Sequence, residues 1–252
     1  MKQIGMIAFT LFQLSAWGTP YFVGRAFPSN QSRYICGEDD MVAMKDQEEL
    51  VQRMGWPVGR LTIDHGSYTS YCSGILVDKD LFLTAAHCGG RCSRMNVQFG
   101  FLYEERRLKF DCDEIVEQGD DEYPEDDYMV IRLQGKPGIE WGWVPLSDKR
   151  LEKNDQLMII HHPSAQPMKV SLKNCLYKYQ YKGMLNHVCD TENGSSGAGI
   201  LSPDFDHVEN TRVVGVHAIG GDCDEDDDPT NRGPAIRNLA KSSELIRSLI
   251  QD

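Results

Sequence analysis

The sequence has no long apolar run beyond its first residues. Residues 4–16 are apolar and follow a basic start at Lys2, but no later stretch approaches the ~18 consecutive apolar residues that a membrane-crossing helix needs. This pattern predicts a secretory signal peptide over residues 1–18, cut after Ala16 or Gly18. We therefore expect an exported protein, extracellular or periplasmic, that is soluble and has no membrane partner.

Positive charge is also scarce. The chain has 26 lysines and arginines against 38 aspartates and glutamates, a net charge of -12. Nucleic acid and anionic membranes would be repelled, which excludes them as the main partners.

The chain has no internal repeat, and two packed six-stranded barrels would use nearly all of its 252 residues.

Cysteine, by contrast, is plentiful. Eight cysteines in an exported chain fit an oxidising compartment and up to four disulfides. Cys92 and Cys112 flank one predicted hairpin, and Cys175 and Cys189 flank another, so each pair is a candidate bridge. A metal site at Cys88, Cys92 and nearby histidines is disfavoured in an oxidising compartment.

Short strand-like runs recur between turn signals. They are rich in Val, Ile, Leu and aromatic residues and are separated by Gly, Pro, Asp and Asn clusters, which predicts an all-β sandwich or barrel. The runs are residues 58–63, 73–77, 81–84, 96–101, 128–133, 157–160, 169–172, 199–201 and 212–217.

Two segments differ from this pattern. Residues 236–250 are predicted to form a C-terminal helix, because Leu245 and Leu249 lie four apart on one face. Residues 19–55 have a polar start and a charged segment at 46–50. They are either a propeptide or an N-terminal arm, before a domain over residues 56–252.

Two distant motifs carry the candidate chemistry. Residues 81–88 end an apolar run with His87, and residues 193–199 set Ser196 among glycines. A serine hydroxyl is a poor nucleophile at neutral pH, so it needs a base within hydrogen-bond reach and small neighbours that let a carbonyl approach the backbone. His87 and Ser196 are therefore the predicted base and nucleophile.

A carboxylate should hold the imidazole in the right tautomer. Asp127 comes directly before the apolar run at 128–133 and is the predicted third member. Asp126 is the alternative, although it lies one residue short of the strand pattern.

The order His, Asp, Ser in residues 84–88, 127–133 and 194–199 resembles the chymotrypsin-like (trypsin-fold) serine peptidases over residues 56–252. The resemblance implies two packed six-stranded antiparallel β-barrels with a C-terminal helix. It also implies an endopeptidase that hydrolyses peptide bonds through an acyl-enzyme, needs no metal or cofactor, takes protein or peptide substrates and is a monomer.

The resemblance assigns a role to each residue. Ser196 attacks the scissile carbonyl, His87 takes and returns the proton, and Asp127 orients the imidazole. The backbone N–H groups of Gly194 and Ser196 form the oxyanion hole. Cys72 and Cys88 match the disulfide that braces the catalytic histidine in that family.

Subtraction then leaves Cys36 to pair with Cys223. The acidic run at 222–228 has oxygen ligands for Ca²⁺ but lacks the ordered spacing of a calcium loop, so we interpret it as a solvated loop. His161 and His162 follow an apolar strand, and we interpret both as structural.

Further details resemble secreted bacterial peptidases of the glutamyl endopeptidase type. They are the segments at residues 36–40, 59–61, 162–163, 189–196 and 214–221. Ser195 stands where animal trypsins have the aspartate that receives a new terminal ammonium, so that switch is not expected here. Ala218 stands where the animal enzymes have a serine that bonds the triad aspartate, so Asp127 must be satisfied otherwise.

The expected substrate pocket gives two conflicting signals. His217 with Thr191 resembles the pair that holds a substrate glutamate in glutamyl endopeptidases. Asp190 falls where trypsins keep the aspartate that attracts lysine or arginine, and it would repel a glutamate unless it bonds His217 or turns away. We favour acidic specificity. The alternatives are an esterase, a Lys/Arg-specific peptidase, and a non-catalytic binding protein on the same scaffold.

Overall fold

The computed structural model describes residues 33–102, 108–221 and 231–251. The predicted signal peptide and the acidic run at 222–228 lie outside these ranges, as does Cys223. No helix among the described residues is long and apolar enough to cross a membrane.

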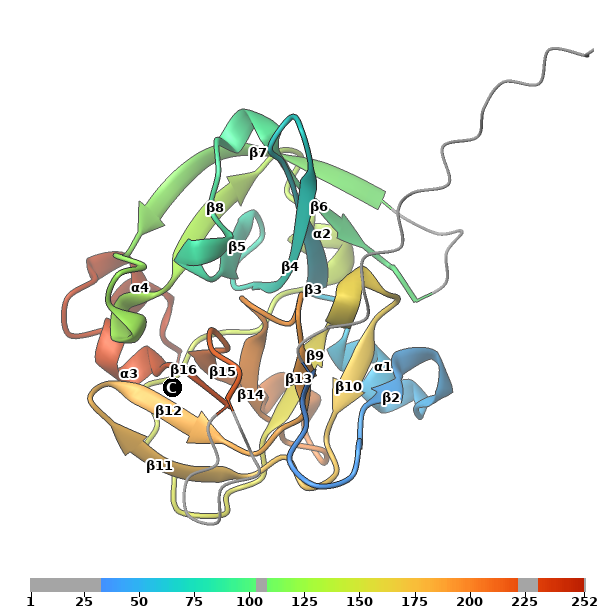
Figure 1. The fold of residues 1–252 in the computed structure, drawn as a ribbon, viewed down its shortest axis with the longest axis vertical. Coiled ribbons are helices and arrows are strands. Elements are labelled where there is room, and N and C mark those ends of the chain that lie inside the picture. The colour runs from blue at the N-terminus through green and yellow to red at the C-terminus, as the bar shows by residue number, and fades with distance from the viewer. Residues whose placement is uncertain (1–32, 103–107, 222–230, 252) are drawn as a thin grey trace, which may run out of the picture. The chain divides into compact units, whose positions relative to one another are not determined.

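The first half of the chain forms a closed barrel of antiparallel strands in the order β3, β4, β5, β8, β7 and β6 (Figure 1). The strands are β3 (Val58–Asp64), β4 (Thr69–Leu76), β5 (Leu81–Thr84), β6 (Met95–Phe99), β7 (Leu108–Gln118) and β8 (Met129–Leu133). Phe82 and Phe99 meet edge to face inside it, with ring centroids 6.0 Å apart. Gly74 makes room for them, because a Cβ there would lie 2.4 Å from the Phe82 ring. The expected first barrel is confirmed.

The second half folds into two main sheets, ordered β15-β14-β9-β10-β2 and β11-β12-β16. Their strands are β2 (Val42–Ala43), β9 (Met158–His161), β10 (Lys169–Ser171), β11 (Tyr177–Tyr181), β12 (Met184–His187), β14 (Gly199–Ser202), β15 (Arg212–Val216) and β16 (Asn231–Pro234). A bridge between Gly215 and Ala235 joins the two sheets. This arrangement is compatible with the second trypsin-like barrel, although its ladder is not continuous.

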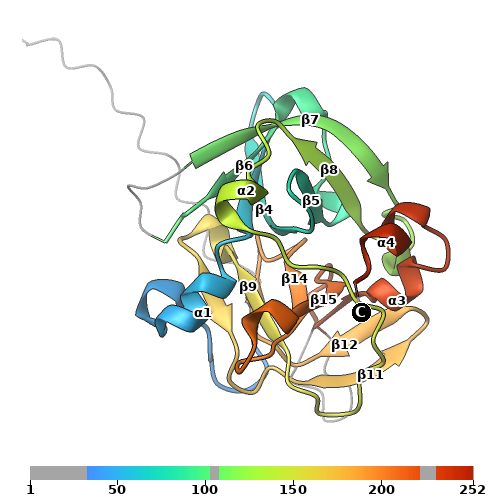
Figure 2. The same ribbon diagram turned by 180° about the vertical axis from the view of Figure 1, so that it is seen from behind.

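The described part of the N-terminal segment packs on this second half. β1 (Arg33–Tyr34) pairs with β13 (Thr191–Glu192), and β2 pairs with β10. The helix α1 (Glu49–Met54) buries Val51 and Met54. Figure 2 shows α1 on one side of the molecule and the C-terminal helices on the other.

The predicted C-terminal helix is present but divided. The structure has α3 (Ile236–Leu239) and α4 (Glu244–Leu249), besides the short α2 (Gly138–Trp141) earlier in the chain. The Oγ of Ser243 accepts a hydrogen bond from the backbone N–H of Ile246 at 2.9 Å. This N-cap starts a new helix, which the four-residue apolar spacing alone did not predict.

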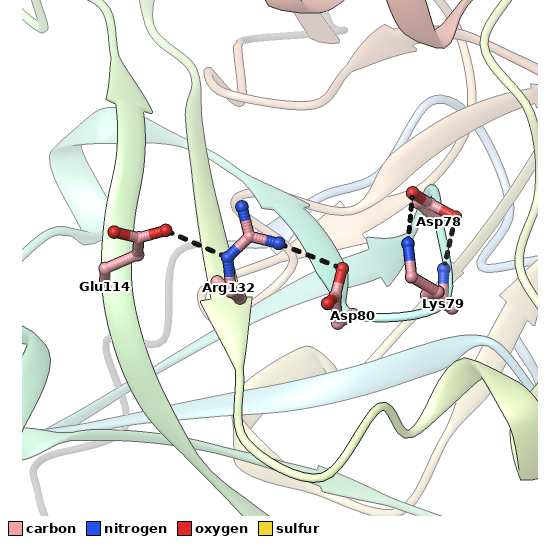
Figure 3. Close-up of polar contacts among 5 residues, drawn as sticks. All are labelled: Asp78, Lys79, Asp80, Glu114 and Arg132. Carbon is pink, nitrogen blue, oxygen red and sulfur yellow. Dashed lines mark hydrogen bonds and ion pairs between the residues drawn. The ribbon is translucent and has the colours of Figure 1, made fainter.

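Arg132 on β8 connects three neighbouring segments of the first barrel. Its Nε lies 2.9 Å from Oε1 of Glu114 on β7, and its Nη1 lies 3.1 Å from Oδ1 of Asp80, just before β5 (Figure 3). Glu114 and Arg132 face each other across the strand pair. These contacts hold the strand that follows Asp127 against both of its neighbours.

Candidate active site

His87 and Asp127 meet because strands β5 and β8 are paired. Thr84 at the end of β5 lies opposite Met129 at the start of β8. Residues that follow β5 and precede β8 therefore share one edge of the barrel. Nδ1 of His87 lies 2.6 Å from Oδ2 of Asp127, and the backbone N–H of His87 donates to Oδ1 at 3.0 Å.

This double contact explains how Asp127 is hydrogen-bonded although Ala218 stands where the animal enzymes have a serine. The carboxylate of Asp127 is buried, and the two groups of His87 engage both of its oxygens without a serine hydroxyl. Because Nδ1–H donates to a carboxylate, Nε2 of a neutral His87 is the acceptor nitrogen. The carboxylate of Asp126 instead accepts from the backbone N–H of Asp120 at 3.2 Å.

Ser196 lies in a turn that packs on the strands leading to His87. The backbone N–H of Ser73 on β4 donates to the carbonyl of Ser196 at 2.8 Å. Gly197 has a φ of +84°, and a Cβ there would lie 2.1 Å from Oγ1 of Thr84. Only glycine lets the chain beside Ser196 approach the end of β5 this closely.

A disulfide ties the same strand to the histidine. Cys72, next to Ser73 on β4, is bonded to Cys88, next to His87. Strand β4 thus contacts both the Ser196 turn and the His87 turn. The expected bridges are all present among the described residues: Cys72–Cys88, Cys92–Cys112 and Cys175–Cys189. The expected pairing of Cys36 with Cys223 lies outside the described residues, because Cys223 does.

His87, Cys72 and Cys88 also form a cluster of metal-ligand types, with ligand atoms within 4.8 Å of one another. Both sulfurs are consumed by their disulfide. Since the thiolate is the metal ligand, this cluster does not fit a metal ion.

The peptide unit between Asn193 and Gly194 is held in one orientation. The carbonyl of Asn193 accepts from the backbone N–H of Ser164 at 2.6 Å. In a trans peptide the C=O and the following N–H point in opposite directions, so the N–H of Gly194 points away from Ser164. Within the described ranges, the N–H groups of Gly194 and Ser196 donate to no protein acceptor. Both are therefore available to a ligand oxygen.

The carboxylate of Asp190 is engaged by the N-terminal segment. Oδ1 accepts from the backbone N–H of Cys36 at 2.9 Å, and Oδ2 accepts from that of Asp40 at 2.7 Å. Burial raises the pKa of Asp190, and the two N–H groups oppose that rise. Both oxygens are thus turned toward the backbone of residues 36–40.

Thr191 and His217 are buried and connected through two residues that were not anticipated from the sequence, His187 and Asn231. Oγ1 of Thr191 lies 3.3 Å from Oδ1 of Asn231, which faces His187 across strands β16 and β12. Nε2 of His187 lies 3.3 Å from Nδ1 of His217. Burial keeps both histidines neutral: it lowers the pKa of His217 to about 3 and that of His187 well below its usual value.

The hydrogen bonds assign the protons of this histidine pair. The backbone N–H of Cys189 donates to Nδ1 of His187 at 3.2 Å, so neutral His187 carries its proton on Nε2. That N–H donates to Nδ1 of His217, which therefore carries its own proton on Nε2. His217 offers an N–H donor from the nitrogen that faces away from His187.

Tyr34 brings the N-terminal segment to the same residues. It pairs with Thr191, and its carbonyl accepts from Nδ2 of Asn231 at 2.9 Å. Its ring lies against Gly220, where a Cβ would approach the ring to 2.0 Å. Any larger residue at position 220 would displace Tyr34.

Comparison with known proteins identifies the family of the chain. The chain matches the family described as lysyl endopeptidase, C-terminal domain, over residues 33–232. Its fold is similar to the structure titled "Structure of Glu endopeptidase in complex with MPD", with a TM-score of 0.62 at 16% identity, covering 85% of this chain and 96% of that one. It is also similar to the serine endoprotease from Yersinia pestis, with a TM-score of 0.58 at 14% identity, covering 81% and 66%. No curated protein sequence matches. The chain belongs to the lysyl endopeptidase C-terminal domain family and is a chymotrypsin-like serine endopeptidase.

Proposed function

We propose that the chain is an exported endopeptidase that forms an acyl-enzyme at Ser196 and cuts after acidic residues. His87 takes the hydroxyl proton and returns it to the leaving amine, and Asp127 orients the imidazole. The N–H groups of Gly194 and Ser196 stabilise the oxyanion. The observation that carries the proposal is the double contact of His87 with Asp127, 2.6 and 3.0 Å.

Support for acidic specificity comes from Asp190 and His217. Both oxygens of Asp190 accept backbone N–H groups, so this carboxylate is not free to pair with a substrate lysine or arginine. The Nε2–H of a neutral His217 suits a carboxylate acceptor, whereas an ammonium would meet it donor to donor. Basic specificity is the second candidate, because the matching family carries the name lysyl endopeptidase.

The contacts of the N-terminal segment favour an arm that stays on the mature enzyme over a propeptide that is removed. Met44 is fully buried, and β1 pairs with the strand that carries Thr191. Removing residues 33–55 would also leave both oxygens of Asp190 without their donors. We therefore expect the mature chain to begin before Tyr34.

Cleavage of a peptide library tests the specificity, with His217→Ala and Asp190→Ser as a matched pair. Under the proposal the wild type cuts after glutamate and perceptibly after aspartate. His217→Ala then loses far more activity on glutamate substrates than on neutral ones, because a buried carboxylate is left without its donor. Cleavage only after lysine or arginine, abolished by Asp190→Ser, would establish the second candidate instead.

A further inference from the structure

Ser195 lies between the two residues whose N–H groups are assigned to the oxyanion hole, and its side chain points into the protein. It is fully buried. Its Oγ accepts from the backbone N–H of Glu192 at 3.0 Å and lies 2.8 Å from Nδ1 of His161. The hydroxyl oxygen is the acceptor in the contact with Glu192, so its own proton is free to donate to Nδ1 of His161.

His161, at the end of β9, holds a second group with its other nitrogen. Nε2 lies 3.4 Å from Oγ of Ser171, and Ser171 donates its proton to the carbonyl of Asp190 at 2.7 Å. A carbonyl can only accept, so the Ser171 oxygen must accept from Nε2–H of His161. The three hydrogen bonds therefore run in one direction: Ser195 donates to His161, His161 donates to Ser171, and Ser171 donates to the carbonyl of Asp190.

The network spans the segment that ends at Ser196. It contacts the backbone of Asp190 and Glu192 and the side chain of Ser195. His161 and Ser171 are both buried, and they lie on the paired strands β9 and β10. A buried polar network with every member satisfied is rigid, so the turn before Ser196 is fastened to the five-stranded sheet.

We propose that His161 is a positioning residue that holds Ser195, and with it the N–H groups of Gly194 and Ser196, in the orientation that stabilises the oxyanion. The proposal rests on the proposed function. In the animal enzymes that the chain resembles, an aspartate at the position of Ser195 is held by a terminal ammonium. Here a neutral hydrogen bond takes that place, so the oxyanion hole needs no newly formed terminus.

Three variants test the proposal: His161→Phe, Ser195→Ala and their combination. We expect kcat to fall about 10- to 100-fold with KM changed by less than about 3-fold, because oxyanion donors act mainly in the transition state and losing one costs ~10²- to 10³-fold. A peptide aldehyde forms a hemiacetal whose oxygen occupies the same hole, so its affinity should fall by the same factor. The losses in kcat of the two single variants should combine less than additively in the double variant, because both changes break the contact between Ser195 and His161.

Thr211→Val is the matched control. Thr211 is a buried residue whose Oγ1 accepts from the backbone N–H of Asp204 at 3.1 Å. Replacing this hydroxyl by a methyl group should lower the thermal midpoint and leave kcat unchanged. If Ser195→Ala and His161→Phe behave like this control, with unchanged kcat and aldehyde affinity, the proposal is wrong. Ser195→Ala keeps the test valid should His161→Phe fail to fold. Full activity in Ser196→Ala would overturn the proposed function itself, and the positioning role with it.

Discussion

Asp190 and Cys36 lie 154 residues apart in the sequence, yet Oδ1 of Asp190 accepts the backbone N–H of Cys36 at 2.9 Å. The contact fastens the N-terminal segment to the residues before Ser196. It also supports the proposed acidic specificity, because a carboxylate with both oxygens engaged is not free to pair with a substrate lysine or arginine. The aspartate that suggested basic specificity thus has a structural partner.

Asp190→Ser should therefore destabilise the protein without changing its cleavage preference. Two partly buried backbone N–H groups would lose a charged acceptor, which costs roughly 2 kcal/mol of unfolding free energy. Chemical denaturation and the library profile should be measured on the same preparation. A switch away from basic residues at unchanged stability would contradict this account.

Asp127→Asn should lower kcat by roughly 10⁴-fold, because an amide favours the wrong imidazole tautomer. Asp126→Asn is the control: its carboxylate contacts the N–H of Asp120 and not His87, so kcat should stay near the wild-type value. Steady-state kinetics of the two variants decide between them. A large loss of kcat in Asp126→Asn alone would show that Asp126, and not Asp127, is the triad carboxylate.

Removing the bridge between Cys72 and Cys88 should both destabilise and inactivate the enzyme. It closes a loop with a sequence separation of 16, for which the chain-entropy model gives about 3 kcal/mol. The bridge joins the strand beneath Ser196 to the turn with His87, so activity should be lost below the temperature of global unfolding. The double variant Cys72→Ala/Cys88→Ala, assayed across temperature, checks this. A double variant that stays active up to its temperature of global unfolding would contradict it.

Acid should destabilise the fold before most carboxylates titrate. Burial lowers the pKa of His162 and His217 to about 3 and those of His161 and His187 well below their usual value. Below pH ~6.5 the unfolded chain binds protons that the folded chain excludes, so stability falls as pH falls toward 3. Each such histidine adds up to ~1.4 kcal/mol per pH unit to this slope.

Denaturant midpoints at pH 7, 6, 5 and 4.5 measure that slope. His162→Phe is the informative variant, because the ring of His162 already stacks on Phe101 and its Nε2 has no partner among the described residues. The variant should retain the fold and show a shallower loss of stability in acid. A midpoint that does not change between pH 7 and 4.5 would show that these histidines do not carry the acid sensitivity.

Much of the fold was predictable where short apolar runs stand between turn residues. The strand at residues 81–84 coincides with β5, and each other predicted run overlaps a strand. Strand β7 was not predicted: Leu108, Phe110 and Cys112 alternate with charged residues, but Glu114 breaks the alternation and a bulge shifts the register there. Bulges depend on the partner strand, which a local pattern does not contain.

Some residues of the candidate site could likewise be predicted from the sequence, and others could not. His87, Asp127 and Ser196 each stand in a local motif, so each could be named from the sequence. His161, His187 and Asn231 enter only through tertiary contacts, such as the bond from Nδ2 of Asn231 to the carbonyl of Cys189. A histidine at the end of an apolar strand was the one available signal for His161, and it predicts burial without indicating a partner.

Covalent labelling tests the central claim most directly. A fluorophosphonate reacts with a serine only when a neighbouring base activates it, and mass spectrometry of the digested adduct identifies the residue. We predict one adduct, on Ser196, that is lost in Ser196→Ala and strongly slowed in His87→Ala. An adduct on Ser195, or none on folded wild-type protein, would contradict the assignment of Ser196 as the nucleophile.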